Sequence, residues 1–557
     1  MIHAKLIPSI EKVFLDTPID SLPVLDHIYA YRNHTVSFQI ALRGDSYDPH
    51  RHFASIRWEG IPDEAVTLRQ VDLVPSLMPA SPAGFDAGYV RTAPGLYPDL
   101  LSPIQMRGCG PCCDRQTRTV WVDVDMTKVP QKKKLYDLNV TFTASINDTS
   151  VTMPLCIRAI PADLPENDFT VTQWFHCDAL ANYYNCEPFS ERHWDAVEKF
   201  MKTAVKNGIN TILTPLFTPP LDTYEGGERR TTQLIGIRKY ANGRYKFDFS
   251  DLDRWIDTAD RAGVKNFEIS HLFTQWGAAH APKIMATTPN GYEKIFGWET
   301  NATGREYKTF LRKFVAEFLD HMKARGDDRR CIFHISDEPH GKQIKQYLKS
   351  KAVIADLIAG YRCIDALSDV NFYKSGIIPT PVAATTHIHE FIQAFEEKGE
   401  TGLWAYYCCG QNIGVSNRYF GMSGARTRFI GCQFYKYRIA GFLQWGYNFY
   451  NNQCSYDAIN PYVDTTGNYF GPSGDMFSVY PGMDGSALES VRINYFREGL
   501  EDQRALQFCE KLIGREKTLE ALEAITGDIV FHKCVNDSAT MLKIRETIDA
   551  LVAKNLK

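Results

Sequence analysis

Short runs of alternating apolar and polar residues fill the first 160 positions of the chain. Regular short strands with this alternation are typical of a β-sandwich, because each strand turns one face to a core and the other to solvent. Prolines gather where the pattern ends, at Pro154, Pro161 and Pro165, and they predict a linker into the next domain. We therefore predict an N-terminal β-sandwich domain over residues 1–164. Its clearest strand candidates are residues 36–42, 120–124 and 138–144.

From about residue 168 the pattern changes to strands that alternate with helices. The segment 190–206 is an example, since Ser190 can cap a helix and apolar residues recur after it at helical spacing. Asn207 and Gly208 end this helix, and a new apolar run follows at once. Eight strand candidates of this kind lie at 169–175, 211–214, 266–270, 331–338, 366–370, 402–407, 441–447 and 477–480.

Eight strand–helix units predict a (β/α)8 barrel with long loops over residues 165–505. An open doubly wound sheet is the competing fold. It is disfavoured because no Gly-x-Gly-x-x-Gly or Walker-type loop follows any of these strands. Beyond residue 505 the chain is helical in pattern and mixed in charge, so we predict a short C-terminal helical segment over 506–557. The predicted fold class is thus α/β, a TIM barrel preceded by a β-sandwich domain.

The composition narrows the class of protein. The 557 residues are 44% hydrophobic and 12% aromatic, and their formal net charge is −4. This balance lacks the basic footprint of a nucleic-acid binder, and no stretch approaches the roughly 20 apolar residues that span a bilayer. The N-terminal residues contain no secretory signal, and 14 cysteines over this length are typical of reduced thiols. We expect a cytoplasmic protein without nucleic-acid or membrane partners, unless a leader precedes this sequence.

Two adjacent carboxylic acids end the fourth strand candidate of the barrel. Asp337 and Glu338 close the run 331–338, and Pro339 follows. Proline lacks an N–H for the sheet and biases the preceding residue, so we expect Glu338 to be extended. Strand alternation puts His334 on the face opposite Asp337, where we expect a core histidine. Paired carboxylates at the C-terminal end of a barrel strand are what a sugar-cleaving enzyme requires.

The other strand ends weaken the simpler alternative, in which Asp337 caps the next helix and Glu338 is only solvated. These ends are rich in aromatic and amide side chains. Aromatic rings stack on the C–H faces of pyranose sugars, while Asn, Gln and His side chains pair with the hydroxyl groups. A single tryptophan is more often core than ligand platform, but four strand ends share the bias. The candidates for substrate binding are His176, Gln275, Trp276, Trp404, Tyr406, Trp445 and Asn448.

Five segments, in order along the chain, carry a resemblance to a known family. They read RNH at 32–34 together with SFQ at 37–39, YPDLL at 97–101, ISDEP at 335–339, GFLQWGYN at 441–448 and REGLED at 497–502. With these segments the chain resembles glycoside hydrolase family 123, the β-N-acetylgalactosaminidases, and the wider group that shares their catalytic domain. The Asp-Glu-Pro motif is short, but the ordered set spans most of the chain.

The resemblance implies an exo-acting, retaining hydrolase that removes terminal β-linked N-acetylgalactosamine, or a related N-acetylhexosamine, by substrate-assisted catalysis. The acetamido oxygen of the substrate would attack the anomeric carbon and form an oxazolinium intermediate. Glu338 would be the general acid and then the base, and Asp337 would orient the acetamido N–H. A tyrosine hydroxyl commonly holds the acetamido oxygen in such sites, with Tyr447 as the first candidate and Tyr406 as the second. A small glycan is then the substrate, no cofactor or metal is implied, and a homo-oligomer stays open.

Two other functions stay open at this point. A glycosidase of the same fold could act on sugars without an acetamido group, and it would need a separate carboxylate nucleophile, for which Asp484 and Glu498 are available. A non-catalytic glycan-binding protein could keep the barrel without the reaction. The presence of Asp337 and Glu338 favours catalysis with substrate assistance over both alternatives.

Overall fold

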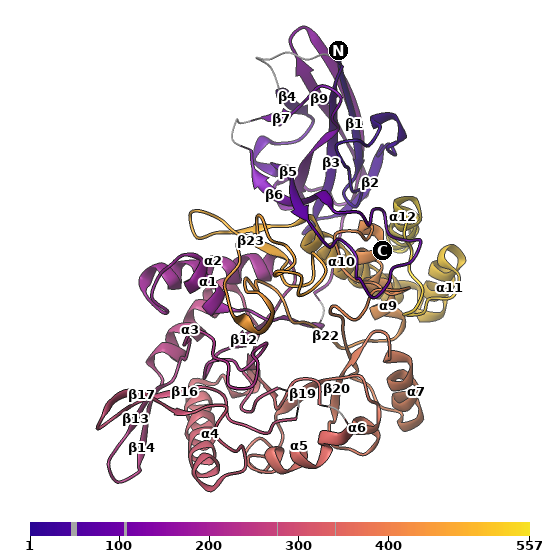
Figure 1. Cartoon of the computed structure of the whole chain (residues 1–557). Coiled ribbons are helices and arrows are strands. Elements are labelled where there is room, and N and C mark those ends of the chain that lie inside the picture. Colours follow the sequence, from indigo (N-terminus) through magenta and orange to yellow (C-terminus); the bar gives the residue numbers. More distant parts are fainter. Residues whose placement is uncertain (46–52, 105–107, 167, 276, 340, 557) are drawn as a thin grey trace.

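The computed structural model of the chain describes residues 1–556 except 46–52, 105–107, 167, 276 and 340. Two five-stranded sheets lie in the N-terminal part, and a closed barrel of eight parallel strands follows (Figure 1). The first sheet has the order β1 (Ile2–Pro8), β3 (Thr35–Gly44), β8 (Arg118–Asp125), β5 (Val66–Ser76) and β6 (Gly95–Pro103). The second has the order β2 (His27–Tyr31), β10 (Thr149–Ile160), β9 (Tyr136–Ile146), β4 (Phe53–Glu59) and β7 (Cys109–Pro111).

The alternation along β8 shows how the N-terminal sheets join the rest of the chain. Its valines point into one apolar cluster that both sheets share. Trp121 and Asp123 point the other way and are nevertheless buried, because helix α10 (Val491–Ile513) packs on that face. The Trp121 ring lies 6.3 Å from the Tyr495 ring of α10. The outer face of this sheet is therefore an internal interface and not a solvent face.

The barrel strands follow one another around the barrel in chain order, each parallel to its neighbours. Because they are parallel, their carboxyl ends meet at one rim. The strands are β11 (Thr170–Gln173), β12 (Thr211–Thr214), β15 (Asn266–Ile269), β18 (Cys331–His334), β19 (Arg362–Leu367), β20 (Thr380–Ala384), β21 (Trp404–Tyr406) and β22 (Gly441–Gln444). The helices between them are α1 (Cys177–Tyr183), α2 (Glu191–Lys206), α3 (Ser250–Ala262), α4 (Arg305–Arg325), α5 (Ile344–Lys351), α6 (Asn371–Lys374), α7 (Ile388–Lys398), α8 (Gly424–Arg428) and α9 (Ile430–Lys436).

One predicted barrel strand is wrong and another escaped prediction. The sequence pattern places the last strand at 477–480, but Val479–Pro481 forms β23, which pairs with β24 (Ala487–Glu489) outside the barrel. The missing barrel strand is β20, between β19 and β21. It contains Pro381, and a proline within a short run argues against a central strand. Proline and small residues thus hide this strand from a pattern-based prediction.

The loops after β12 and β15 contribute a small additional sheet that the pattern did not predict. Four strands form it, in the order β14 (Tyr245–Asp248), β13 (Gly236–Lys239), β16 (Ile284–Thr288) and β17 (Gly291–Phe296). Figure 1 shows this sheet projecting from the side of the barrel. It lengthens these two loops without adding a strand to the barrel.

The helices α10, α11 (Arg515–Thr526) and α12 (Ser538–Asn555) end the chain beside the N-terminal sheets (Figure 1). Helix α10 runs without a break through residue 505, where the sequence predicts a domain boundary, because most of its length is buried. Within the described part of the chain, every helix is too short or too polar to span a bilayer.

Candidate active site

A cavity of about 240 Å³ opens at the rim where the carboxyl ends of the barrel strands meet. This is the end at which parallel α/β barrels carry their active sites, because the loops after the strands converge there. The cavity combines carboxylates, aromatic rings and an amide, contributed by loops far apart in the sequence. Its lining includes Trp174, His176, Asp222, Gln275, Asp337, Glu338, Tyr406, Trp445 and Phe470.

Asp337 and Glu338 lie side by side in this cavity, on the loop that follows β18. Glu338 has a φ of +41°, in the left-handed region, so the prediction that Pro339 keeps it extended is wrong. This conformation strains a non-glycine residue, and such strain is common at functional sites. Tyr406, at the end of β21, donates a hydrogen bond from its hydroxyl to Glu338 Oε1 at 2.7 Å. The hydrogen bond holds the Glu338 carboxyl within the cavity.

A buried polar network lies beneath Asp337. His334 Nδ1 is 3.0 Å from Glu268 Oε1, and His334 Nε2 is 3.4 Å from Asp365 Oδ1. Burial opposes a charge on His334, but the hydrogen bond to Glu268 and the charge of Asp365 outweigh it and raise the pKa of His334. The prediction that His334 faces away from Asp337 is wrong, since the two side chains are neighbours. Strand β18 ends at His334, so its alternation does not continue to residue 337.

Burial and the adjacent Glu338 carboxylate raise the pKa of Asp337 to about 8, although the charge of His334 opposes this. At neutral pH Asp337 therefore keeps its proton. An amide N–H placed against Asp337 by a ligand would favour the ionised form of that residue.

His271, His334 and Asp337 are the described residues that could hold a metal ion. One donor atom from each lies within 4.8 Å of the other two, and neither ring nitrogen of His271 has a hydrogen-bond partner. Glu268 accepts from His334 Nδ1, as carboxylates do behind metal-bound histidines. Imidazole and carboxylate ligands suit a transition metal such as Zn²⁺, which would bind the Asp337 carboxylate as one of its ligands. No sequence spacing could show this group, because His271 follows β15 whereas His334 ends β18.

Trp445 is a predicted sugar-binding residue that lines the cavity. Its half-buried ring lies 4.9 Å from the Phe449 ring and 5.8 Å from the Phe470 ring. The indole N–H donates to Asp475 Oδ2 at 3.0 Å, which fixes the ring orientation. The result is a rigid aromatic wall, as stacking on a sugar requires.

Gln275 and His176 also line the cavity, but their polar atoms are already engaged. The Gln275 amide accepts from Asp222 N at 2.8 Å and donates to Thr223 O at 2.9 Å. His176 Nε2 is 2.8 Å from Trp445 O, and its Nδ1 is 3.1 Å from Arg229 Nη2. Burial and the charge of Arg229 lower the pKa of His176 to about 3, so this imidazole is neutral. Both residues therefore position the cavity wall instead of offering free groups to a sugar.

Three predicted substrate-binding residues lie elsewhere in the structure, and these predictions require correction. The Tyr447 hydroxyl donates to Phe200 O at 2.9 Å in the core, so it does not reach the cavity. The Trp404 ring packs over Gly441, where an added Cβ would lie 2.2 Å from it. The buried Asn448 side chain pairs with the backbone of His176. Trp276, the remaining prediction, lies outside the described residues.

Asp222 and Asp475 are parts of the site that the sequence did not reveal. Asp222 lines the cavity with one buried carboxylate oxygen unpartnered, and burial raises its pKa to about 6. Asp475 supports Trp445, and burial likewise raises its pKa to about 6. Both belong to long loops, where no periodic pattern marks a residue. The two nucleophiles considered for the alternative mechanism, Asp484 and Glu498, are not among the cavity-lining residues; Glu498 is buried against Arg428 at 2.8 Å.

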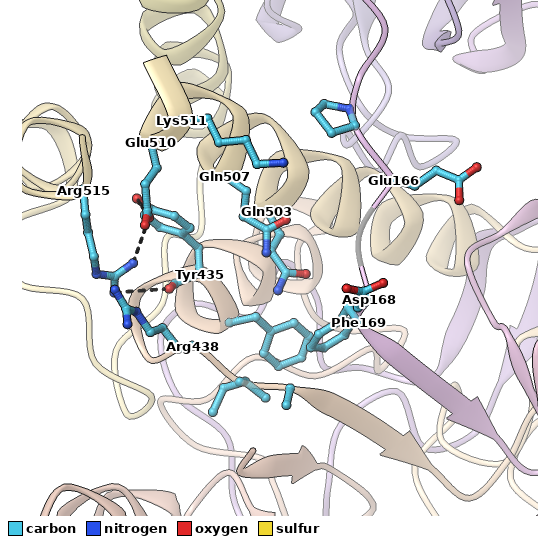
Figure 2. A pocket seen from close by; sticks show the side chains of 14 residues that line it. Glu166, Asp168, Phe169, Tyr435, Arg438, Gln503, Gln507, Glu510, Lys511 and Arg515 are labelled. Carbon is cyan, nitrogen blue, oxygen red and sulfur yellow. Dashed lines mark hydrogen bonds and ion pairs between the residues drawn. The ribbon is translucent and has the colours of Figure 1, made fainter. Parts of the chain in front are cut away.

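A second cavity, of about 470 Å³, lies at the opposite end of the barrel, where β11 and β22 begin (Figure 2). Its basic and acidic side chains include Arg515, which donates to Glu510 Oε2 at 3.1 Å and also contacts the Tyr435 backbone. We do not expect the active site at this end, because the active-site loops of barrels emerge from the other rim. We take the smaller cavity as the candidate active site because Asp337 and Glu338 line it.

Residues 174–509 match the family described as glycoside hydrolase 123, catalytic domain. The chain belongs to glycoside hydrolase family 123. The matched range contains the whole carboxyl rim, including Asp337 and Glu338, so the family and the cavity point to the same part of the molecule. A glycosidase reaction is what membership of this family implies.

Solved structures support the fold. A family 123 glycoside hydrolase from Clostridium perfringens, described with glycolipid glycan hydrolysis, is 14% identical, with a TM-score of 0.76 over 100% of this chain and 99% of that one. An endo-β-1,4-mannanase from Thermotoga petrophila is 12% identical, with a TM-score of 0.35 over 62% and 78% of the two chains. No curated protein sequence matches this chain. The first of these similarities shows a shared fold along the whole chain.

Proposed function

We propose that this protein is an exo-acting, retaining hydrolase of terminal β-linked N-acetylgalactosamine, or a related N-acetylhexosamine, with substrate-assisted catalysis. The observation that carries the proposal is the Asp337–Glu338 pair, side by side in a cavity at the carboxyl rim of the barrel. Membership of family 123 supports the reaction class. The work on glycolipid glycans with the Clostridium perfringens relative supports a glycan substrate.

In this mechanism the acetamido oxygen of the substrate attacks the anomeric carbon while the bond to the leaving oxygen breaks. Glu338 gives its proton to that oxygen, and an oxazolinium intermediate forms. Glu338 then takes a proton from water, whose oxygen attacks the anomeric carbon and restores the acetamido group. Two displacements retain the anomeric configuration. No carboxylate of the protein becomes bonded to the sugar.

Asp337 accepts a hydrogen bond from the acetamido N–H and balances the positive charge of the intermediate. The raised pKa of Asp337, about 8, reflects a carboxyl group that lacks a donor to stabilise its charge. When the acetamido group binds, its N–H favours the Asp337 carboxylate, while the mechanism requires a proton on Glu338, where the leaving oxygen needs it. Tyr406, and not Tyr447, supplies the tyrosine hydroxyl that this mechanism uses, because Tyr406 lines the cavity and donates a hydrogen bond to Glu338.

A glycosidase with its own nucleophile is the second candidate, and Asp222 is the observation that favours it. Asp222 comes from the loop after β12, whereas Glu338 comes from the loop after β18. Its unpartnered carboxylate oxygen could attack a sugar that lacks an acetamido group. The two mechanisms differ in which aspartate the reaction requires.

Several broader assignments accompany the proposal. We infer that the barrel is of the (β/α)8 type, that the two N-terminal sheets form a β-sandwich, and that the domains divide at residues 164 and 505. We also propose that the protein acts in the cytoplasm on small glycans, without nucleic-acid or membrane partners. A homo-oligomer remains open.

The test is hydrolysis of aryl β-GalNAc, β-GlcNAc and β-glucoside by the wild type and by Glu338→Gln, Asp337→Asn and Asp222→Asn. Substrate assistance predicts turnover of an acetamido sugar only, with losses of at least about 100-fold in the first two variants. Turnover of β-glucoside that requires Asp222 and tolerates Asp337→Asn would replace the mechanism with the second candidate. Binding without turnover of any substrate would favour a glycan-binding protein.

A further inference from the structure

Two exposed tyrosines stack on each other, one on each of two loops that contribute to the active-site cavity. The ring centroids of Tyr224 and Tyr456 are 4.8 Å apart, and their planes differ by 18°. The residues are 44% and 63% exposed, so the contact does not belong to the hydrophobic core. Each ring covers one face of the other, and the surface left exposed, which is larger on Tyr456 than on Tyr224, is available to a ligand.

The two tyrosines sit close to the catalytic cavity along the chain. Tyr224 comes two residues after Asp222, and Tyr456 comes two residues after Cys454; both Asp222 and Cys454 line the cavity. Two residues of extended chain span at most about 7 Å, so each tyrosine backbone lies near the rim. Ser455 Oγ donates to Asp222 O at 2.9 Å, which joins the two loops directly.

The Tyr224 loop is held from both sides. The Gln275 amide binds the backbone of Asp222 and of Thr223, at 2.8 and 2.9 Å. Farther along the same loop, Arg229 forms a buried ion pair with Asp178 at 2.6 Å. The Tyr224 side chain therefore emerges from a fixed backbone, although it is exposed.

The Tyr456 loop is closed on itself and strained. Asn452 and Asp457 exchange two hydrogen bonds of 2.9 Å across its base. Cys454 and Ser455 have φ values of +57° and +54°, and Asp222 in the facing loop has +44°. These left-handed non-glycine residues lie within two positions of Tyr224 or Tyr456 along the chain. Strain of this kind persists only where the surrounding structure holds it, and it is common at ligand sites.

From these observations we propose that Tyr224 and Tyr456 form a second sugar subsite, which binds the hexopyranose on the reducing side of the cleaved bond. The proposal rests on the proposed function of the cavity. A cavity of about 240 Å³ lies below the roughly 300–1,000 Å³ of typical ligand pockets, so it suits a single sugar ring. The next ring of a glycan must then lie outside, at the rim. An aromatic face there stacks on its C–H face, and the phenol hydroxyls can pair with its hydroxyl groups.

The test compares a disaccharide of β-linked N-acetylgalactosamine on galactose with methyl β-N-acetylgalactosaminide, whose aglycone has no ring. In Tyr224→Ala and Tyr456→Ala, kcat/KM for the disaccharide should fall about tenfold more than for the methyl glycoside, mainly through KM. Tyr224→Phe and Tyr456→Phe keep the stacking face and should retain most of the preference. Tyr292→Ala is the matched control, since Tyr292 is 64% exposed but belongs to the projecting strand β17.

Binding separates a failure of this proposal from a failure of the proposed function. Calorimetry with the inactive Glu338→Gln protein should show tighter binding of the disaccharide than of N-acetylgalactosamine, and the added Tyr→Ala change should remove the difference. This arm needs no turnover. Equal affinities for the two sugars, or a preference that survives both alanine variants, would overturn the second subsite while leaving the hydrolase proposal to its own test.

Discussion

The Tyr406 hydroxyl donates a hydrogen bond to Glu338 Oε1 at 2.7 Å, and this contact joins two parts of the barrel rim that β19 and β20 separate. The backbone of Glu338 is in the left-handed conformation, and Tyr406 is the last residue of strand β21. A side chain on a rigid strand thus fixes one on a strained loop. Because Tyr406 is buried and lies beside Glu338, its own pKa is well above the usual value, and it stays a donor throughout the working pH range.

Tyr406→Phe removes this donor and keeps the ring. We expect kcat for an aryl N-acetylhexosaminide to fall about 10- to 100-fold, because Glu338 loses the hydrogen bond that orients it. An unchanged kcat with a raised KM would mean that Tyr406 contacts only the substrate. Ser368→Ala is the control, because its Oγ is 3.4 Å from the same hydroxyl.

The raised pKa of Asp337 makes stability depend on pH. Its pKa is about 8 in the folded protein and near 4 when unfolded, so the folded state binds the proton more tightly between these values. The wild type should therefore lose stability as pH rises from about 4 to about 8, by at most about 1.4 kcal/mol per pH unit. Asp337→Asn cannot ionise and should escape this loss.

The measurement is the melting temperature of both proteins at pH 5, 6, 7 and 8. The variant should gain on the wild type steadily from pH 5 toward pH 8, where the difference between them should be largest. A constant difference across this range would show that Asp337 does not hold its proton so tightly. Asp484→Asn, a change of an exposed carboxylate, serves as the control and should follow the wild type.

Asp475 supports Trp445 through the indole N–H, at 3.0 Å. Asp475→Leu removes the acceptor and should free the tryptophan ring, so we expect KM to rise several-fold with a smaller effect on kcat. Asp475→Asn retains an oxygen acceptor and should be milder. Tryptophan fluorescence anisotropy tests the cause directly, and an unchanged KM in the leucine variant would argue against sugar stacking on Trp445.

The strands and the place of the Asp337–Glu338 pair at a strand end could be predicted from the sequence because they depend on local patterns. The apolar run before Asp337 and the buried alternation of β8 are both visible in a few consecutive residues. Strand β20 escaped because Pro381 interrupts its pattern. Alternation also failed just beyond β18, where the backbone turns left-handed at Glu338.

The site predictions failed where a tertiary contact decides the role of a side chain. Tyr406 ends β21 and Tyr447 lies three residues after β22, both with aromatic neighbours, so only the three-dimensional path of the chain distinguishes their roles. Tyr447 reaches the carbonyl of Phe200 in the core, while Tyr406 reaches Glu338. Asp222 lies in a loop with no periodicity, so its place in the cavity depends on the contact with Gln275.

The last prediction concerns the ion pair between Asp99 and Arg492, which joins β6 of the N-terminal sheets to α10. The guanidinium donates to both carboxylate oxygens, at 2.6 and 2.9 Å, and both side chains are fully buried. Asp99→Ala leaves the arginine charge buried without its partner, which typically costs about 3–5 kcal/mol. We expect a clearly lower melting temperature and exposure of the interface between the N-terminal sheets and the barrel.

Limited proteolysis with calorimetry distinguishes a weakened interface from general unfolding. Cleavage near the linker at Pro161 and Pro165 should accelerate in Asp99→Ala before the barrel itself unfolds. Asp16→Ala is the matched control, because its pair with Arg91 is exposed at the surface and should contribute about 0–1 kcal/mol. Equal effects of the two variants would contradict the role of the buried pair. Arg497 of helix α10 also donates a hydrogen bond to Ser37 across this interface. A loosened interface should therefore lower activity only when it disturbs the barrel against which α10 packs.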